Sequence, residues 1–281
     1  MRPSTKVKIA AIAGSAAVLA GLTVGLPRLS AWMRRGGNGL SVAESDYFEV
    51  HAADAAGAAD LGRKADRFVR EMAGQYASLG FVVPQDPVPV YLFPAHEDFA
   101  RHARFRTGSG LENNGGYFSP AEMAIALVGT DETALRHELT HLLAHVAWPG
   151  ADLTPWFSEG HAQWHEAGPR GGIPVVALAA CRHLYADRPL PPIDLLVELD
   201  RGAFTAAGNS DAYALVAILY SWLATERPEA LARITRLELQ PGTPSAQQFS
   251  AALKEDLEGA RNDWERWFRN LGGSAGGDPG R

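Results

Sequence analysis

Cysteine is almost absent from this sequence, since Cys181 is the only one among 281 residues. A disulfide framework within the chain and a cysteine-ligated zinc site are therefore excluded, and a lone cysteine is most often a small buried apolar side chain. Clusters of basic residues are missing as well. The formal net charge is −6 and the Lys and Arg residues are dispersed, so nothing in the composition indicates nucleic-acid binding.

Long apolar runs are scarce too, and the one that stands out lies at the N-terminus. Three basic residues, Arg2, Lys6 and Lys8, precede an uncharged stretch that extends from residue 9 to residue 26. Such a stretch is long enough to span a bilayer as a helix. Secretory signals have the same layout, although no small-x-small cleavage site follows here. We therefore predict a membrane anchor or an export signal at residues 1–28, with the domain outside the cytoplasm.

The rest of the chain divides into a linker, a single domain and a tail. Glycine and small polar residues predict a flexible linker over residues 29–45, and the glycine-rich end predicts a disordered tail over residues 272–281. Hydrophobic residues make up 46% of the chain, which is enough for a buried core in the part between the linker and the tail. We predict one folded domain over residues 46–271.

Strand patterns come early in this domain and helical patterns come later. Period-two alternation marks the strands, and apolar residues at helical spacing mark the helices. Together they predict an α+β fold in which a small mixed sheet is followed by a mainly helical C-terminal half. The predicted strands are 46–52, 88–93 and a hairpin over 115–129. The predicted helices are 53–79, 95–105, one capped by Thr130 or Asp131 and ended by Pro149, one beginning near Thr154, 174–185, 211–225 and 228–239.

A His-Glu-x-x-His motif lies within the segment RHELTHLLAH, residues 136–145. Positions four apart lie on one face of a helix, so His137 and His141 can bind one metal ion. Glu138 is offset by about 100° around the helix axis, beside the metal, which suits a general base that acts on water. A catalytic zinc site needs a third protein ligand and one open position.

Four side chains compete for the position of third ligand. Glu159 lies 18 residues after His141, on a predicted helix that returns alongside the first. Asp152 lies in the intervening loop and would be poorly held. His145 lies a further turn along the helix, about 6 Å away, and His161 should point away from Glu159. Glu159 is the favoured ligand.

The segments RHELTHLL and PWFSEGHAQW resemble the gluzincin metallopeptidases of the peptidase MA-like families, in which a P-x-W-[FL]-x-E-G element follows the His-Glu-x-x-His helix. The likeness extends over most of residues 46–239. It implies a zincin-like fold with a zinc ion held by His137, His141 and Glu159. One departure is His161, where these families usually have an apolar residue.

The resemblance also implies an activity, the zinc-dependent hydrolysis of peptide bonds with Glu138 as general base. In related enzymes a side chain from a later helix stabilises the oxyanion, which points to Tyr213 or, as the alternative, Tyr220; a core aromatic is an equally good interpretation of either. The AIALV strand, Ala124–Val128, resembles the edge strand along which such peptidases bind an extended substrate.

The remaining polar candidates carry weaker signals. Gln163 and Glu166 follow Glu159 by one and two turns and could accept hydrogen bonds from the ligating histidines, although solvated positions explain them more simply. The other histidines have no useful spacing and are predicted at the surface or at helix caps: His51, His96, His102, His165 and His183.

We predict a membrane-anchored or exported zinc metallopeptidase that acts on a peptide or protein substrate and has no nucleic-acid partner. Two alternatives keep the zinc: a membrane-tethered interaction module with a structural metal, and an amidase that acts on cell-wall peptides. Glu138 argues against the first, since a structural site needs no base. A third alternative treats the two histidines as ordinary helix residues, and it must take Glu138, Glu159 and the preceding strand as coincidence.

Overall fold

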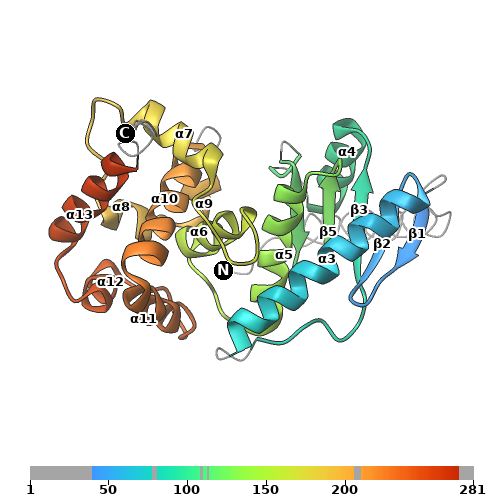
Figure 1. The fold of residues 1–281 in the computed structure, drawn as a ribbon, viewed down its shortest axis with the longest axis horizontal. Coiled ribbons are helices and arrows are strands. Elements are labelled where there is room, and N and C mark those ends of the chain that lie inside the picture. Colours follow the sequence, from blue (N-terminus) through green and yellow to red (C-terminus); the bar gives the residue numbers. More distant parts are fainter. Residues whose placement is uncertain (1–39, 78–80, 108–109, 113, 206–209, 272–281) are drawn as a thin grey trace, which may run out of the picture.

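The computed structural model describes residues 40–77, 81–107, 110–112, 114–205 and 210–271. The predicted anchor or signal at 1–28 and the predicted tail at 272–281 lie outside these residues. Within the described part of the chain, no helix is both apolar enough and long enough to cross a membrane. Figure 1 shows a sheet at one end of the molecule and a group of helices at the other, with α5 and α6 between them.

The sheet has five strands and mixed pairing, in the order β1-β2-β3-β5-β4. The inner strands β2, β3 and β5 are parallel, and β1 and β4 pair antiparallel at the two edges. The predicted α+β fold with a small mixed sheet is thus confirmed. The strands are β1 (Ser41–Glu44), β2 (Phe48–Ala52), β3 (Val88–Phe93), β4 (Gly116–Ser119) and β5 (Ala124–Val128).

Two details of the sheet differ from the sequence prediction. Strand β1 lies within the predicted linker, because it gains its hydrogen bonds from β2 and so needs little apolar content of its own. The segment AIALV is β5, and the prediction that it forms the edge is wrong, because β5 lies between β3 and β4. Its first four residues are buried, as is typical of a strand covered on both faces. The edge strand is β4.

Helices cover both faces of the sheet. On one face, α3 (Ala55–Tyr76) and α5 (Glu132–Ala147) pack on side chains such as Ile125 and Leu127. On the other face, α4 (His96–Thr107) packs near Ala126. The alternation along β5 thus separates two apolar clusters, and α5 is held against the sheet close to its β4 edge.

The C-terminal half is helical, as predicted. At its centre is α10 (Ser210–Glu226), in which every residue from 215 to 223 is buried; a helix that is apolar all round belongs inside a core. The surrounding helices are α6 (Pro155–Glu166), α7 (Val175–Leu184), α8 (Ile193–Val197), α9 (Arg201–Thr205), α11 (Pro228–Glu238), α12 (Ala246–Leu253) and α13 (Leu257–Asn270). The sequence prediction did not include α8, α9, α12 or α13.

Candidate metal centre

Helix α5 carries both histidines of the motif toward α6. It begins after Asp131, whose carboxylate accepts a hydrogen bond from Thr133 N–H, which confirms one of the two predicted caps. The rings of His137 and His141 lie with centroids 4.8 Å apart. Their Nε2 atoms are separated by 3.1 Å, so both nitrogens point at the same place.

Helix α6 is fixed at its start by residues far away in the sequence. It begins after Thr154, with Pro155 in the first helical position, where the missing N–H costs nothing. The carboxylate of Glu238 at the end of α11 accepts hydrogen bonds from the backbone N–H and the hydroxyl of Thr154, at 2.9 and 2.7 Å. The side chain of Thr154 forms no cap hydrogen bond within α6, and the Glu238 carboxylate instead holds the first residue of the helix start in place.

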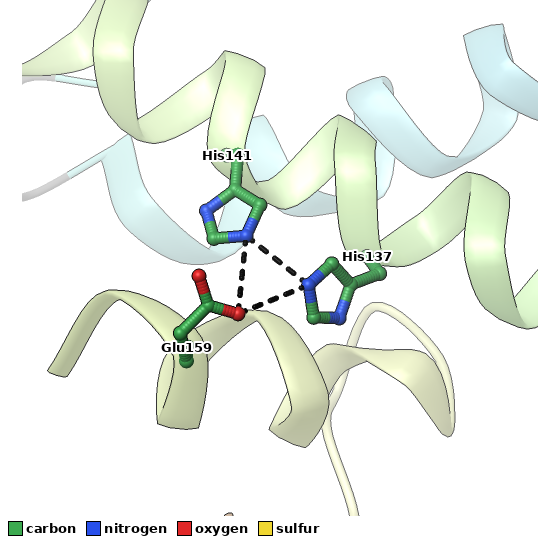
Figure 2. A group of neighbouring side chains, drawn as sticks. All are labelled: His137, His141 and Glu159. Atoms are coloured by element: carbon green, nitrogen blue, oxygen red, sulfur yellow. Dashed lines mark hydrogen bonds and ion pairs between the residues drawn. The ribbon is translucent and has the colours of Figure 1, made fainter. Parts of the chain in front are cut away.

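Glu159 on α6 completes a group of three ligand atoms (Figure 2). Its Oε2 lies 3.3 Å from His137 Nε2 and 3.7 Å from His141 Nε2. Tetrahedral bonds of 2.0–2.1 Å place neighbouring ligand atoms about 3.3–3.4 Å apart, close to the three separations observed. Among the described residues, this is the group of His, Cys, Asp and Glu side chains that could hold a metal ion.

The competing ligands do not join this group. His145 is exposed and its ring lies 5.7 Å from that of Phe118. Asp152 is exposed and lines the cavity beside the site. His161 points away from Glu159, as predicted, toward the hydroxyl of Tyr76. Glu159 therefore takes the place that the sequence argument assigned to it.

The outer ring nitrogens of both histidines have partners of their own. Glu166 lies 2.9 Å from Nδ1 of His137, and Ser158 Oγ lies 3.3 Å from Nδ1 of His141. Such partners fix the orientation of a ligating ring. The simpler interpretation of Glu166 as a solvated residue is thus wrong, because α6 returns close enough for the carboxylate to reach α5. The contact of Ser158 was missed, since serine carries no such signal in a sequence.

The side chains of His137 and Glu159 shift each other's pKa values toward the charged forms. Burial pulls the pKa of His137 down, but hydrogen bonds with Glu159 and Glu166 outweigh it and raise the pKa well above its usual value. Burial likewise acts to raise the pKa of Glu159, yet the charge of His141 and the hydrogen bond with His137 bring it far below its usual value. A cation bound here would displace the proton of His137, because only the neutral imidazole is a metal ligand, while Glu159 is already ionised.

Glu138 faces the same cavity but is not one of the three ligands. It is 7% exposed, and burial raises the pKa of its carboxyl against the opposing charges of His137 and His141. The backbone of Phe118 on β4 forms a hydrogen bond with it. Gly116 makes room for it, because a Cβ atom there would lie 3.2 Å from Glu138 Cγ.

A cavity of about 460 Å³ opens over the group and distinguishes the two candidate tyrosines. Tyr213 lines the cavity together with Arg201. Burial, with added effects from Glu159 and Glu138, raises the pKa of Tyr213 to about 12. Tyr220 is buried and forms a hydrogen bond with Tyr76 on the far side of α6. Of the two, Tyr213 is therefore the one beside the ligands.

The edge strand β4 lines this cavity too. The N–H of Val128 donates to the carbonyl of Gly115, and hydrogen-bonded pairs alternate along an antiparallel ladder. Tyr117 therefore directs its backbone groups toward β5, whereas Gly116 and Phe118 direct theirs toward the outer edge. The N–H of Phe118 donates to Glu138, so an extended chain at this edge would pair with the backbone groups of Gly116 and the carbonyl of Phe118.

No protein-family model matches the chain, and no curated protein matches its sequence.

The other histidines and Gln163 differ in whether they are buried or exposed. His165 and His102 are buried rather than exposed, because α3 and the aromatic cluster around α4 cover them. His96 and His183 are exposed, as predicted. Gln163 is buried and donates a hydrogen bond to the carbonyl of Tyr213. It links α6 to α10 and leaves the ligating histidines to Glu166 and Ser158.

Proposed function

We propose that this protein is a zinc-dependent hydrolase of gluzincin type that cleaves peptide bonds. The observation that carries the proposal is the convergence of His137, His141 and Glu159 with a buried glutamate, Glu138, on one cavity. Two imidazoles and one carboxylate, leaving one position open, are the ligand set of catalytic zinc sites. A structural site would have a fourth protein ligand and no need of Glu138.

The chemistry follows from the positions of these side chains. A bound zinc ion supplies Lewis-acid polarisation of the scissile carbonyl and lowers the pKa of a bound water. Glu138 would accept a proton from the attacking water and pass it to the leaving amine. The phenol of Tyr213 stays protonated at neutral pH and donates to the developing oxyanion.

An extended peptide is the substrate that the surroundings of the site favour. The outer edge of β4 presents the backbone groups of Gly116 and the carbonyl of Phe118 along the cavity, whereas the N–H of Phe118 donates to Glu138. A peptide can add to such an edge as a further strand. Beyond His141 the cavity wall is formed by Ala144 of α5 and by Trp148 just after it, together with the polar side chains of His145 and Asp152. We therefore propose a peptide or protein substrate.

The location of the activity is part of the same proposal. The basic start and apolar run of residues 1–28 support an anchor or export signal. The domain would then act outside the cytoplasm, tethered to the membrane or released.

The test compares the full chain with two variants, purified in detergent and reconstituted with zinc. Bound zinc per chain is measured by mass spectrometry, and hydrolysis is measured on a peptide library. Glu138→Gln keeps the shape of the side chain but removes the base, so it should retain zinc and lose about 10²–10⁴-fold in rate. Glu159→Ala should lose most of the zinc. The matched control is Glu229→Gln, an exposed acid on α11.

Each alternative outcome has a definite meaning. Equal zinc in wild type and Glu159→Ala would refute the assignment of the third ligand. Full hydrolysis by Glu138→Gln would refute the role of the base. Bound zinc with no cleavage in the peptide library, but cleavage of cell-wall peptides, would replace the peptidase with an amidase that uses the same metal site.

A further inference from the structure

The face of α6 that points away from the metal group carries a second pair of histidines. His161 and His165 are four residues apart, and their ring centroids lie 4.9 Å apart. Both rings approach the hydroxyl of Tyr76 at the end of α3, at 3.0 Å from His161 Nε2 and 2.7 Å from His165 Nε2. Both histidines are buried. A single phenol from the sheet half of the molecule thus binds two side chains of α6.

The hydrogen-bond pattern assigns each proton in this group. His165 Nδ1 faces the carbonyl of Gly168 at 3.3 Å and must carry a hydrogen, because a carbonyl only accepts. Burial lowers the pKa of His165 to about 4, so the ring is neutral and Nε2 accepts the proton of the Tyr76 hydroxyl. Tyr76 then accepts from His161 Nε2–H and from the hydroxyl of Tyr220.

Hydrogen bonds account for the contacts within this group. Separations of 2.7 and 3.0 Å between Tyr76 and the two histidines are those of hydrogen bonds. The role of Tyr76 is therefore to hold α6 in place.

We propose that Tyr76 is a positioning residue for the metal centre. Positions 159 and 166 lie within about 20° of each other around a helix, and positions 161 and 165 lie about 100–160° away from them. The two bonds to Tyr76 oppose rotation of α6 about its axis. They thereby hold Glu159 at the metal and Glu166 at Nδ1 of His137.

Because this role rests on the proposed function, the experiment measures metal binding rather than hydrolysis. Tyr76→Phe in the full chain keeps the ring and removes the hydroxyl. The dissociation constant for zinc, measured by competition with a chromophoric chelator, is expected to rise about tenfold, the lower end of the range for losing a group that orients a ligand. The absorption spectrum of bound Co²⁺ is expected to shift, because the ligand geometry changes. Tyr185→Phe, a buried tyrosine on the far side of the helical half, is the matched control and should leave both unchanged.

The result that overturns the proposal is an unchanged zinc affinity and Co²⁺ spectrum in folded Tyr76→Phe, even where its melting temperature has fallen. Should Tyr76→Phe fail to fold, Tyr220→Phe removes only the outer hydroxyl and should weaken zinc binding by a smaller factor. Hydrogen exchange of the α6 amides in the metal-free protein is independent of zinc. It should accelerate in Tyr76→Phe and not in Tyr185→Phe, so unaltered exchange refutes the role of Tyr76. Failure of wild type to bind zinc refutes the proposed function alone.

Discussion

Gly160 is the residue whose substitution tests the arrangement of α6 most directly. It follows Glu159, the proposed third ligand, and faces α10 at very close range. A Cβ atom at this position would lie 2.8 Å from Tyr220 Cβ and 2.9 Å from the carbonyl oxygen of Val216. Ordinary contacts between carbon atoms are about 3.5–4.0 Å, so Gly160→Ala forces the two helices apart by at least about half an ångström.

Two opposing contributions set the change in the free energy of unfolding of Gly160→Ala. Alanine stabilises a helix interior relative to glycine by about 0.5–1 kcal/mol. Overpacking of a well-filled contact costs about 1–3 kcal/mol, and here the neighbours include the backbone of Val216, which cannot turn away. We expect Gly160→Ala to lower the free energy of unfolding by about 1 kcal/mol. We also expect weaker zinc binding, because Glu159 moves with the helix.

Gly74 provides the matched control in the same chain. It lies inside α3, is exposed, and an added Cβ atom would meet nothing within 4 Å. Gly74→Ala is therefore expected to raise the free energy of unfolding by about 0.5–1 kcal/mol. Urea unfolding followed by circular dichroism, at constant m-value, measures both variants. If Gly160→Ala proves as stable as Gly74→Ala and binds zinc like wild type, the close approach of α6 and α10 is refuted.

Two further predictions concern buried or half-buried carboxylates. Glu166→Ala removes the acceptor of His137 Nδ1–H and should raise the zinc dissociation constant, measured by chelator competition, about 10–100-fold. Glu166→Gln should stay closer to wild type, because its amide oxygen still accepts the hydrogen bond. Equal zinc affinity in wild type and Glu166→Ala would contradict this prediction. Glu238 is 1% exposed, and burial raises the pKa of its carboxyl above the usual value. The folded state therefore keeps the carboxyl proton to a higher pH than the unfolded state does. As a result, the free energy of unfolding falls as the pH rises through the raised pKa. Glu238→Gln should therefore lose less stability than wild type as the pH rises above the usual carboxyl pKa of 4.5. Urea midpoints measure this, with Glu229→Gln as the control, and parallel curves for wild type and Glu238→Gln would exclude the effect.

Local patterns were enough to predict most of the elements near the site. The choice of Thr130 or Asp131 as a cap placed the beginning of α5 to within one residue, and the pair Thr154-Pro155 placed that of α6. Both succeeded because helix starts depend on neighbouring backbone N–H groups. The spacing of four residues placed His137 and His141 on one face of α5. Those inferences needed only the geometry of a single helix.

Predictions that depended on strand order or on contacts across the fold were less successful. A hairpin sequence does not determine which of its arms reaches the edge, and pairing with β3 placed β5 inside the sheet. The short helices α8 and α9 lack the length that makes a period detectable. His165 was expected at the surface, since nothing near it in the sequence indicates that Tyr76 would cover it.

The types of candidate ligand, their spacing on α5 and the neighbouring Glu138 could be predicted from the sequence, because those properties repeat with the turn of one helix. Contacts between distant elements bring Glu159 to the two histidines and place Tyr213 rather than Tyr220 on the cavity wall. Such contacts also bring Glu166 to His137. These outcomes depend on the rotation and approach of α6, which Gly160, Glu238 and Tyr76 set through contacts with other helices.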